Sequence, residues 1–318
     1  MSTTVQYGRV LVTGGAGFVG SHLVDALTND GVEVRVLDNL STGQSDYLKP
    51  LMGTDKMQFI EGDLRDEGKV KAAVKDVEAV FHLAAITSVP YSVQYPEVTR
   101  QVNVEGTRTV LEACLREGVE QVINVSSCAV YGEPKYLPVD EGHPTNPISP
   151  YAETKLEAEQ LCREFREASG LKITVLRPFN VYGSRMRKDQ YGGVIARFAE
   201  QLRVQKPPII YGDGEQTRDF LYVEDAVRAM RLVLGRNQAV GRTLNIASGS
   251  PTSINQLAGL MIRLFGASGV KPQYRQARAG DIQQSYANIE AAKTVLGFQP
   301  RLDITAGLQQ TFKQILAE

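Results

Sequence analysis

A glycine-rich segment near the N-terminus constrains the fold most strongly. The residues Val10-Leu-Val-Thr-Gly-Gly-Ala-Gly-Phe-Val-Gly-Ser-His-Leu are typical of a buried strand, a tight turn and the start of a helix. Gly14, Gly17 and Gly20 have the spacing G-x-x-G-x-x-G. Glycines in such a turn let the backbone approach a pyrophosphate and let the helix pack close to the strand. Because the segment follows the first strand and opens the first helix, it predicts a phosphate-binding turn.

The rest of the chain alternates short apolar runs with helical patterns, as in a doubly wound parallel sheet. We expect strands over residues 9–12, 32–37, 57–60, 79–82, 121–125, 173–176 and 243–246, and helices over 21–30, 102–117, 151–169 and 194–203. After Asn180 the pattern changes to loops and short elements. The sequence therefore predicts an α/β fold, a Rossmann doubly wound parallel sheet with a smaller C-terminal substrate-binding α/β cap.

Composition excludes several functional classes. The 318 residues carry a formal charge of −1, without the basic excess that is usual for a nucleic-acid partner. No apolar run reaches the roughly 18 residues of a membrane span, and glycines interrupt the N-terminal apolar stretch, so we expect neither a membrane segment nor a signal peptide. Cys114, Cys128 and Cys162 lack paired or metal-ligand spacing, which favours reduced thiols, no metal site and a cytoplasmic location.

An acidic residue near the end of the second predicted strand indicates the cofactor. Asp38 lies 18 residues after Gly20. A carboxylate there accepts hydrogen bonds from both ribose hydroxyls of NAD and repels the 2′-phosphate of NADP. The alternative is a solvated loop aspartate. Arg35 is the nearest cation, but strand alternation directs it away, so we predict NAD.

Hydroxyl groups and a lysine suggest acid–base chemistry. Tyr151 and Lys155 are four residues apart, so they share one helix face. A free tyrosine has a pKa of about 10, and a nearby ammonium lowers it, although such pairs also occur by chance. Ser126 and Ser127 follow a predicted strand, where ligands of open α/β sheets bind. Either serine hydroxyl can bind a substrate hydroxyl, and a turn or capping role is the alternative.

These segments resemble the extended short-chain dehydrogenase/reductase family, from Val10 nearly to the C-terminus. The matching segments are Thr13-Gly-Gly-Ala-Gly-Phe-Val-Gly, Asp38-Asn-Leu-Ser-Thr-Gly, Gly62-Asp-Leu, His82-Leu-Ala-Ala, Asn103-Val-Glu-Gly-Thr, Ser126-Ser, Val130-Tyr-Gly, Tyr151-x-x-x-Lys155, Arg177-Pro-Phe-Asn-Val-Tyr-Gly and Arg218-Asp-Phe. Within that family, the chain is most similar to the UDP-glucose 4-epimerases and their UDP-N-acetylglucosamine relatives.

The resemblance implies a set of site residues. It assigns catalysis to Ser127, Tyr151 and Lys155. It assigns NAD binding to Gly14, Gly17, Phe18, Val19, Asp38, Asn39, Ser41, Gly43, Asp63, Leu64, Leu83, Ala84, Ala85, Asn103, Ser126, Tyr151, Lys155 and Pro178. It assigns substrate binding to Ser88, Ser127, Tyr151, Asn180, Val194, Tyr211, Arg218, Arg278, Asp281 and Ser285. The two arginines suit a diphosphate, which guanidinium groups bind bidentately.

The resemblance also implies a reaction, the epimerisation of UDP-glucose and UDP-galactose at C4 through a transient 4-keto sugar. Related 4,6-dehydratases carry an Asp-Glu pair after the active-site hydroxyl residue, but here Cys128 and Ala129 follow Ser127. Neither side chain can serve as acid and base in an elimination, so dehydration is disfavoured. Ser285 aligns where some epimerases carry a tyrosine, so we expect room for the 2-acetamido group of UDP-GlcNAc and UDP-GalNAc.

Several alternatives stay open. A UDP-glucuronate epimerase or decarboxylase and a plain sugar-ketone reductase share the same catalytic set, whereas a non-catalytic NAD-sensing regulator is expected to have lost Tyr151 or Lys155. The predicted domains are residues 1–179 plus about 222–247 for NAD, and about 180–221 plus 248–318 for the nucleotide sugar. The resemblance implies a homodimer through the helices over 102–117 and 151–169.

Overall fold

A seven-stranded sheet forms the centre of the computed structural model, which describes residues 7–186, 193–277 and 280–315. Its strands are β1 (Arg9–Thr13), β2 (Glu33–Asp38), β3 (Met57–Glu61), β4 (Ala79–His82), β5 (Gln121–Val125), β6 (Lys172–Pro178) and β11 (Thr243–Ile246). The order is β11-β6-β5-β4-β1-β2-β3, and every neighbouring pair is parallel. This order confirms the predicted doubly wound sheet, because strands β1 to β3 extend to one side and β4, β5, β6 and β11 extend to the other, with the switch point between β1 and β4.

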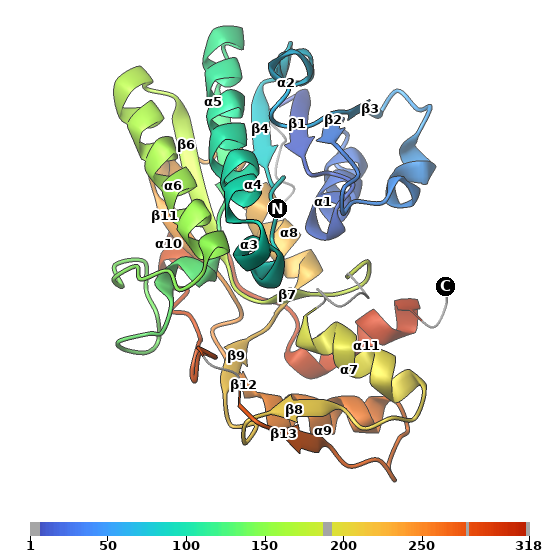
Figure 1. Cartoon of the computed structure of the whole chain (residues 1–318). Helices are drawn as coiled ribbons and strands as arrows, with labels where there is room; N and C mark the ends of the chain where they lie inside the picture. Colours follow the sequence, from blue (N-terminus) through green and yellow to red (C-terminus); the bar gives the residue numbers. More distant parts are fainter. Residues whose placement is uncertain (1–6, 187–192, 278–279, 316–318) are drawn as a thin grey trace.

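Helices cover both faces of the sheet (Figure 1). On one face lie α2 (Glu67–Val74), α5 (Gly106–Glu117) and α6 (Pro150–Ser169), and on the other lie α1 (Phe18–Asn29) and α8 (Val223–Val233). The alternation of side chains along β1 supplies both layers. Val10 and Val12 join the core that contains α1 and α8, whereas Leu11 joins the core of α2, α5 and α6. Burial on both faces explains the continuous apolar runs in the sequence.

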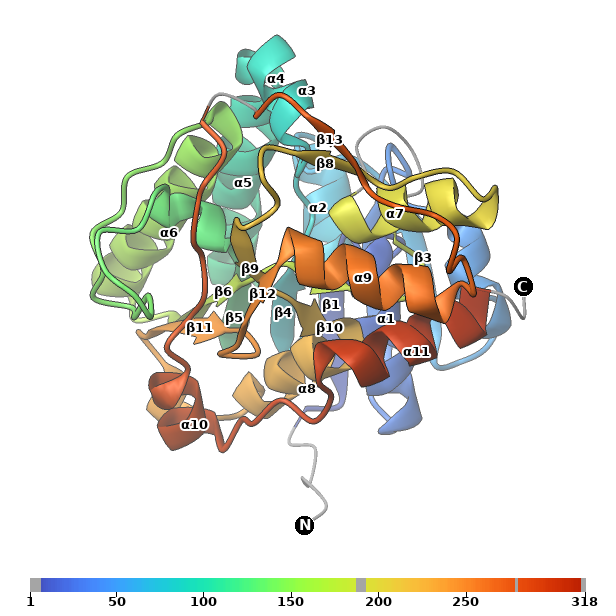
Figure 2. The same cartoon turned by 90° about the horizontal axis from the view of Figure 1, so that it is seen from below.

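The remaining elements lie mainly beyond the carboxyl ends of these strands (Figures 1 and 2). Helices α7 (Val194–Arg203), α9 (Ile254–Leu264) and α11 (Ile304–Ile315) pack together there. Three short strand pairs accompany them: β7 (Val181–Tyr182) with β10 (Leu221–Tyr222), β8 (Ile209–Tyr211) with β13 (Gln273–Arg275), and β9 (Thr217–Asp219) with β12 (Pro251–Ser253). Helix α10 (Glu290–Leu296) packs against β11 and α8.

Two short helices connect β4 to α5. Helix α3 (Val89–Gln94) is followed by α4 (Pro96–Arg100), and a π-helical turn over Gln101–Glu105 then leads into α5. Both α3 and α4 pack against α6.

The predicted boundaries are confirmed at β4, β5, α7 and β11, and two helix starts differ by more than one residue. Helix α1 starts at Phe18 rather than at residue 21, because the extended Gly17 ends the turn earlier. The helix predicted over 102–117 is α-helical only from Gly106, after the π-helical turn. Such turns often occur at functional sites.

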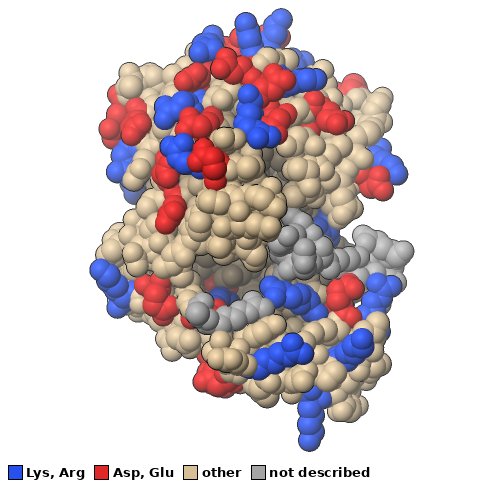
Figure 3. Space-filling view, in the orientation of Figure 1, with Lys and Arg blue, Asp and Glu red and all other residues tan. Residues whose placement is uncertain are grey.

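The molecular surface carries mixed charges. On the face seen in Figure 3, acidic and basic side chains alternate over the helices at the top, and the surface is hollowed between the sheet and the cap elements. Within the described ranges, no helix is long and apolar enough to cross a membrane. The three cysteines are unpaired.

The glycine-rich turn generates a stability prediction. A Cβ on Gly20 would lie 2.1 Å from the Gly14 carbonyl oxygen, which is backbone and cannot move aside easily. We expect Gly20→Ala to lower the free energy of unfolding by about 3 kcal/mol, the upper end of typical overpacking. Gly269→Ala is the matched control, since no atom lies within 4 Å of its Cβ position. Equal denaturant midpoints for the two variants would contradict the prediction.

Candidate active site

The start of α1 forms an open cradle beside the end of β1. Gly17 precedes the helix in an extended conformation and supplies no side-chain cap, so N–H groups of the first turn are left for a ligand. Within 4 Å, a Cβ on Gly17 would meet only the Gly14 carbonyl oxygen, at 3.1 Å. Gly14 has a φ of +71°, and its Cβ position lies 2.8 Å from the Ala84 nitrogen. The cradle therefore fits a pyrophosphate, as NAD binding requires.

Asp38, the last residue of β2, faces the same turn. It accepts hydrogen bonds from the N–H groups of Ala16 (3.0 Å) and Leu40 (2.9 Å). Burial raises the pKa of Asp38, and these two bonds oppose the rise. A carboxylate offers about four acceptor positions, so some remain for ribose hydroxyls. Arg35 instead donates to Gln58 on β3, away from Asp38, as strand alternation predicts.

A second acidic residue is fixed at the end of β3. Arg65 holds both carboxylate oxygens of Asp63, each at 2.8 Å, and Asn39 donates to the same carboxylate. The Arg65 guanidinium keeps the pKa of Asp63 well below its usual range. Sequence reasoning missed Arg65, although an arginine two residues after Asp63 was visible. Among the other predicted cofactor residues here, Ser41 donates its N–H to Asn39, Gly43 packs on Ala16, and Leu64 packs against Gly106.

A buried histidine joins the ends of β1 and β4. The Nδ1 of His82 lies 2.8 Å from the Thr13 hydroxyl, and its Nε2 lies 2.9 Å from the Thr107 hydroxyl. Thr107 donates its only hydroxyl hydrogen to the Asn103 carbonyl oxygen (2.6 Å), so Nε2 must be the donor to Thr107. Burial lowers the pKa of His82 to about 3. The ring is therefore neutral, with a structural role.

Thr13 and Asn103 hold the loop after β4. The Thr13 hydroxyl oxygen accepts the N–H groups of Leu83 and Ala84, both at 3.2 Å. The Asn103 amide accepts from the Ile86 N–H (2.7 Å) and donates to the Ile86 carbonyl oxygen. Asn103 also donates to the hydroxyl of Thr154 on α6 (3.0 Å). The π-helical turn thus ties this loop to the helix that carries Tyr151.

Tyr151 and Ser127 meet at the carboxyl end of β5. Burial raises the pKa of Tyr151 to about 12, and a hydrogen bond with Ser127 opposes the rise. The Ser127 hydroxyl also accepts the Ala129 N–H at 3.2 Å. Lys155 donates from Nζ to the Val125 carbonyl oxygen (2.8 Å), and burial lowers its pKa to about 8. The expected lowering of the tyrosine pKa by Lys155 is wrong for this structure, because desolvation dominates.

A buried ion pair lies behind these residues. Arg177 on β6 donates to both carboxylate oxygens of Glu159 on α6, at 2.9 and 2.5 Å. The Ser126 hydroxyl donates to Glu159 as well (2.5 Å), so its hydrogen is not available to a ligand at the same time. The Arg177 guanidinium lies 4.7 Å from the Tyr131 ring centre. Sequence reasoning did not identify Glu159, which lies one helical turn after Lys155.

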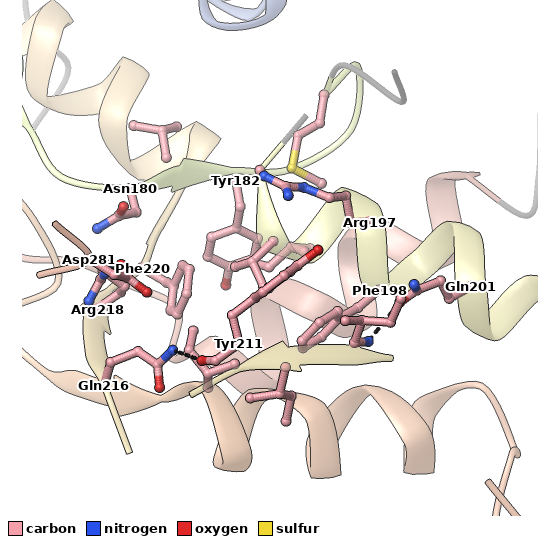
Figure 4. A pocket seen from close by; sticks show the side chains of 18 residues that line it. Asn180, Tyr182, Arg197, Phe198, Gln201, Tyr211, Gln216, Arg218, Phe220 and Asp281 are labelled. Carbon is pink, nitrogen blue, oxygen red and sulfur yellow. Dashed lines mark hydrogen bonds and ion pairs between the residues drawn. The ribbon is translucent and has the colours of Figure 1, made fainter. Parts of the chain in front are cut away.

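A cavity of about 370 Å³ opens between β7, α7 and β8. Five predicted substrate residues line it: Asn180, Val194, Tyr211, Arg218 and Asp281. Figure 4 shows Asn180, Arg218 and Asp281 at one end and Arg197, Phe198 and Gln201 at the other. The aromatic rings of Tyr182 and Phe220 form part of its wall. Apart from Val194 and Tyr211, the α7 and β8 lining residues were missed, since only the folded chain brings these segments together.

One end of the cavity is an ion pair. Arg218 donates to an Asp281 carboxylate oxygen at 2.5 Å and to the carbonyl oxygens of Thr217 and Ile282. The adjacent Asp219 is fully buried and accepts four hydrogen bonds, two of them from Ser248. Asp219 therefore holds the loops together, while Arg218 remains at the cavity wall.

The remaining predicted residues lie elsewhere. Ser88 caps α3 by accepting the Tyr91 N–H (3.2 Å), and Ser285 is buried outside the cavity lining. Pro178 ends β6, opposite Ile246 of β11. Phe18 and Val19 form the first turn of α1, and Ala85 is half-buried after β4. Arg278 lies outside the described residues. Within the described ranges, no group of three or more His, Cys, Asp or Glu is arranged to hold a metal ion.

The sequence matches known proteins over most of its length. The profile described as the NAD dependent epimerase/dehydratase family matches residues 10–247. The chain is 37% identical over 305 residues to the UDP-glucose 4-epimerase of Mycolicibacterium smegmatis, covering 95% of this chain and 97% of that protein. It is 35% identical over 309 residues to UDP-glucuronic acid decarboxylase 1 of Xenopus tropicalis, covering 95% of this chain and 71% of that protein.

Solved structures agree with the fold. The UDP-glucose 4-epimerase of Thermotoga maritima, crystallised with UDP-glucose, has a TM-score of 0.91 at 37% identity, covering 97% and 99% of the two chains. The UDP-N-acetylglucosamine 4-epimerase of Methanobrevibacter ruminantium, in complex with UDP-N-acetylmuramic acid, has a TM-score of 0.92 at 36% identity, covering 98% of each chain. The UDP-glucuronic acid 4-epimerase of Bacillus cereus, in complex with UDP-glucuronic acid and NAD, has a TM-score of 0.90 at 32% identity, covering 97% of this chain and 99% of that chain. The predicted fold class, family and NAD cofactor are confirmed.

The buried ion pair generates a second stability prediction. Glu159→Gln keeps the size of the side chain but leaves Arg177 buried without a counter-charge, so we expect unfolding to be easier by about 3 kcal/mol. Glu167→Gln is a matched control on the same helix. Its partner is the surface residue Arg166, at 3.4 Å, and exposed pairs of this kind contribute about 0.5 kcal/mol. Urea titration measures the free energy of unfolding of both variants. A decrease for Glu159→Gln no greater than that for Glu167→Gln would refute the prediction.

Proposed function

Since the chain belongs to the NAD-dependent epimerase/dehydratase family, we propose that it is an NAD-dependent 4-epimerase of UDP-glucose and UDP-galactose. One observation carries the proposal. Tyr151 and Ser127 meet at the carboxyl edge of the sheet, which also holds the open start of α1. Cys128 and Ala129 supply no acid–base pair for dehydration. Epimerisation at C4 needs only a carrier of hydride and a group that moves one proton.

The carrier is the cofactor of this family. When bound, NAD accepts a hydride from a substrate carbon and returns it, so turnover needs no external oxidant. The uncapped N–H groups of α1 would hold its pyrophosphate. The free acceptor positions of Asp38 would hold a ribose, and a 2′-phosphate would meet this buried carboxylate.

Tyr151 is the residue that moves the proton. At neutral pH, a phenol with a pKa of about 12 keeps its proton, so Tyr151 is suited to donate it to the oxygen of a 4-keto sugar. To accept a proton from a 4-hydroxyl, it needs additional positive charge in the site. Ser127 lies close to Tyr151 and can orient the same sugar oxygen. Lys155, fixed on Val125, anchors the helix beneath them.

The cavity beside Arg218 is the proposed site of the nucleotide. Its volume lies within the range of about 300–1,000 Å³ that is usual for small-molecule pockets. Tyr211 and Phe220 offer aromatic surfaces for a base, and Asn180 lies next to Arg218. Because a guanidinium binds a diphosphate bidentately, the substrate would replace Asp281 as the partner of Arg218.

A second candidate is chemistry on UDP-glucuronate. It is supported by the similarity to the Xenopus decarboxylase and the Bacillus cereus epimerase. The N-acetylated UDP-hexoses are additional candidate substrates. The domain division, the cytoplasmic location and the homodimer through α5 and α6 remain predictions.

Product analysis tests the proposed function. We expect the purified protein to interconvert UDP-glucose and UDP-galactose with no net release of NADH. Tyr151→Phe should lower kcat by about 10²–10⁴-fold, the usual contribution of a general acid–base. Chromatography after separate incubation with UDP-glucose, UDP-GlcNAc and UDP-glucuronate identifies the products. Stoichiometric NADH or a decarboxylated product would reject epimerisation.

Sugar selectivity gives a separate prediction. Ser285 is buried, and a tyrosine there would fill space that we assign to a 2-acetamido group. We expect Ser285→Tyr to reduce kcat/KM for UDP-GlcNAc at least tenfold more than for UDP-glucose, because the larger substrate loses its room. Ser285→Ala is the control and should preserve both activities. An equal loss on the two substrates after Ser285→Tyr would show that the residue does not select the sugar.

A further inference from the structure

Each N–H group in the first turn of α6 has a hydrogen-bond partner. Ser149 precedes the helix and accepts the Ala152 N–H through its hydroxyl (3.2 Å). Pro150, in the first helical position, has no N–H to satisfy. The Glu153 N–H reaches the Ser149 carbonyl oxygen (2.9 Å). Only the N–H of Tyr151 then lacks a partner within its own segment.

Ser92 supplies that partner from another helix. Its hydroxyl oxygen accepts the Tyr151 N–H at 3.1 Å, across 59 residues of sequence. The same hydroxyl donates to the Val89 carbonyl oxygen (2.7 Å), which fixes its orientation. Ser92 belongs to α3 and is fully buried where this helix packs against α6. Water therefore does not compete for this bond.

Helix α3 is itself held at its N-terminal end by Ser88. Its N-cap, Ser88, bonds to the Tyr91 N–H, and the Ser92 N–H bonds to the Ser88 carbonyl oxygen at 2.9 Å. The position of the Tyr151 backbone is therefore set by α3 as well as by its own helix. In Figure 1, α3 lies directly beside the start of α6.

We propose that Ser92 is a positioning residue for Tyr151, holding the backbone of the proton-transferring residue in place through a cap from outside its helix. The inference rests on the proposed function only for the role of Tyr151. A catalytic group displaced by about 1 Å can lose up to 100-fold in rate. Removal of the Ser92 hydroxyl therefore changes turnover more than substrate binding.

The test compares two serine caps of equal length. Ser92→Ala removes the acceptor of the Tyr151 N–H. Ser253→Ala removes the acceptor of the Gln256 N–H at the start of α9, also at 3.1 Å and also from a buried serine. For each variant, kcat, KM for UDP-glucose, Tm and amide hydrogen exchange are measured. Ser92→Thr keeps the hydroxyl and tests rescue.

We expect Ser92→Ala to lower kcat about tenfold, with KM changed less than twofold and faster amide exchange at residues 151–153. Ser253→Ala should show faster exchange at the start of α9 and a kcat within twofold of the wild type. Ser92→Thr should recover kcat to within about threefold. If Ser92→Ala does not fold, Ser92→Cys serves instead, because a thiol is a weak acceptor.

The proposal is overturned if kcat of Ser92→Ala falls no further than that of Ser253→Ala, or if exchange at Tyr151 is unchanged. A raised KM with normal kcat also overturns it. If the wild-type protein converts none of the three UDP-sugars, the proposed function fails. The exchange measurement on the protein alone then decides whether Ser92 holds Tyr151.

Discussion

The parallel direction of all seven strands is the constraint on which the rest of the structure depends. Because their carboxyl ends meet at one edge, the strand direction brings residues that are far apart in the sequence together there. Thr13, Asp38, His82 and Ser127 each lie at or just after the end of a different strand. The cap elements close over the same edge (Figure 2). The location of the site therefore follows from the strand direction, and the individual side chains then decide its chemistry.

Sequence patterns predicted the parts of this arrangement that are local. The glycine spacing, the acidic end of β2 and the four-residue spacing of Tyr151 and Lys155 on one helix are all contained within short segments. The cap from Ser92 joins residues 59 positions apart through one hydroxyl, and no local pattern marks it. Likewise, the partner of Glu159 is known only once α6 packs on β6. The direction of the Tyr151 pKa shift could not be predicted from the sequence either, since it depends on burial of the side chain rather than on the neighbouring lysine.

Desolvation governs the ionisable groups around Tyr151. His82 is neutral because both ring nitrogens face threonine hydroxyls in a dry environment. Lys155 has a pKa lowered to about 8, which is opposed by Glu159, so burial and charge act against each other on one ammonium. Glu159 itself accepts hydrogen bonds from Arg177 and Ser126. The buried polar network thus sets both the geometry and the charge state of the helix that carries Tyr151.

The Arg218–Asp281 pair has a consequence for which anions can enter the cavity. A carboxylate attached to the same chain competes for the guanidinium as if it were present at millimolar concentration or above. Chloride or a single phosphate, offering weak or one-point contact, must outcompete this built-in counterion. A diphosphate can bridge several donors at once and displace it. Under the proposed function, this ion pair would therefore favour ligands that carry more than one phosphate over single anions.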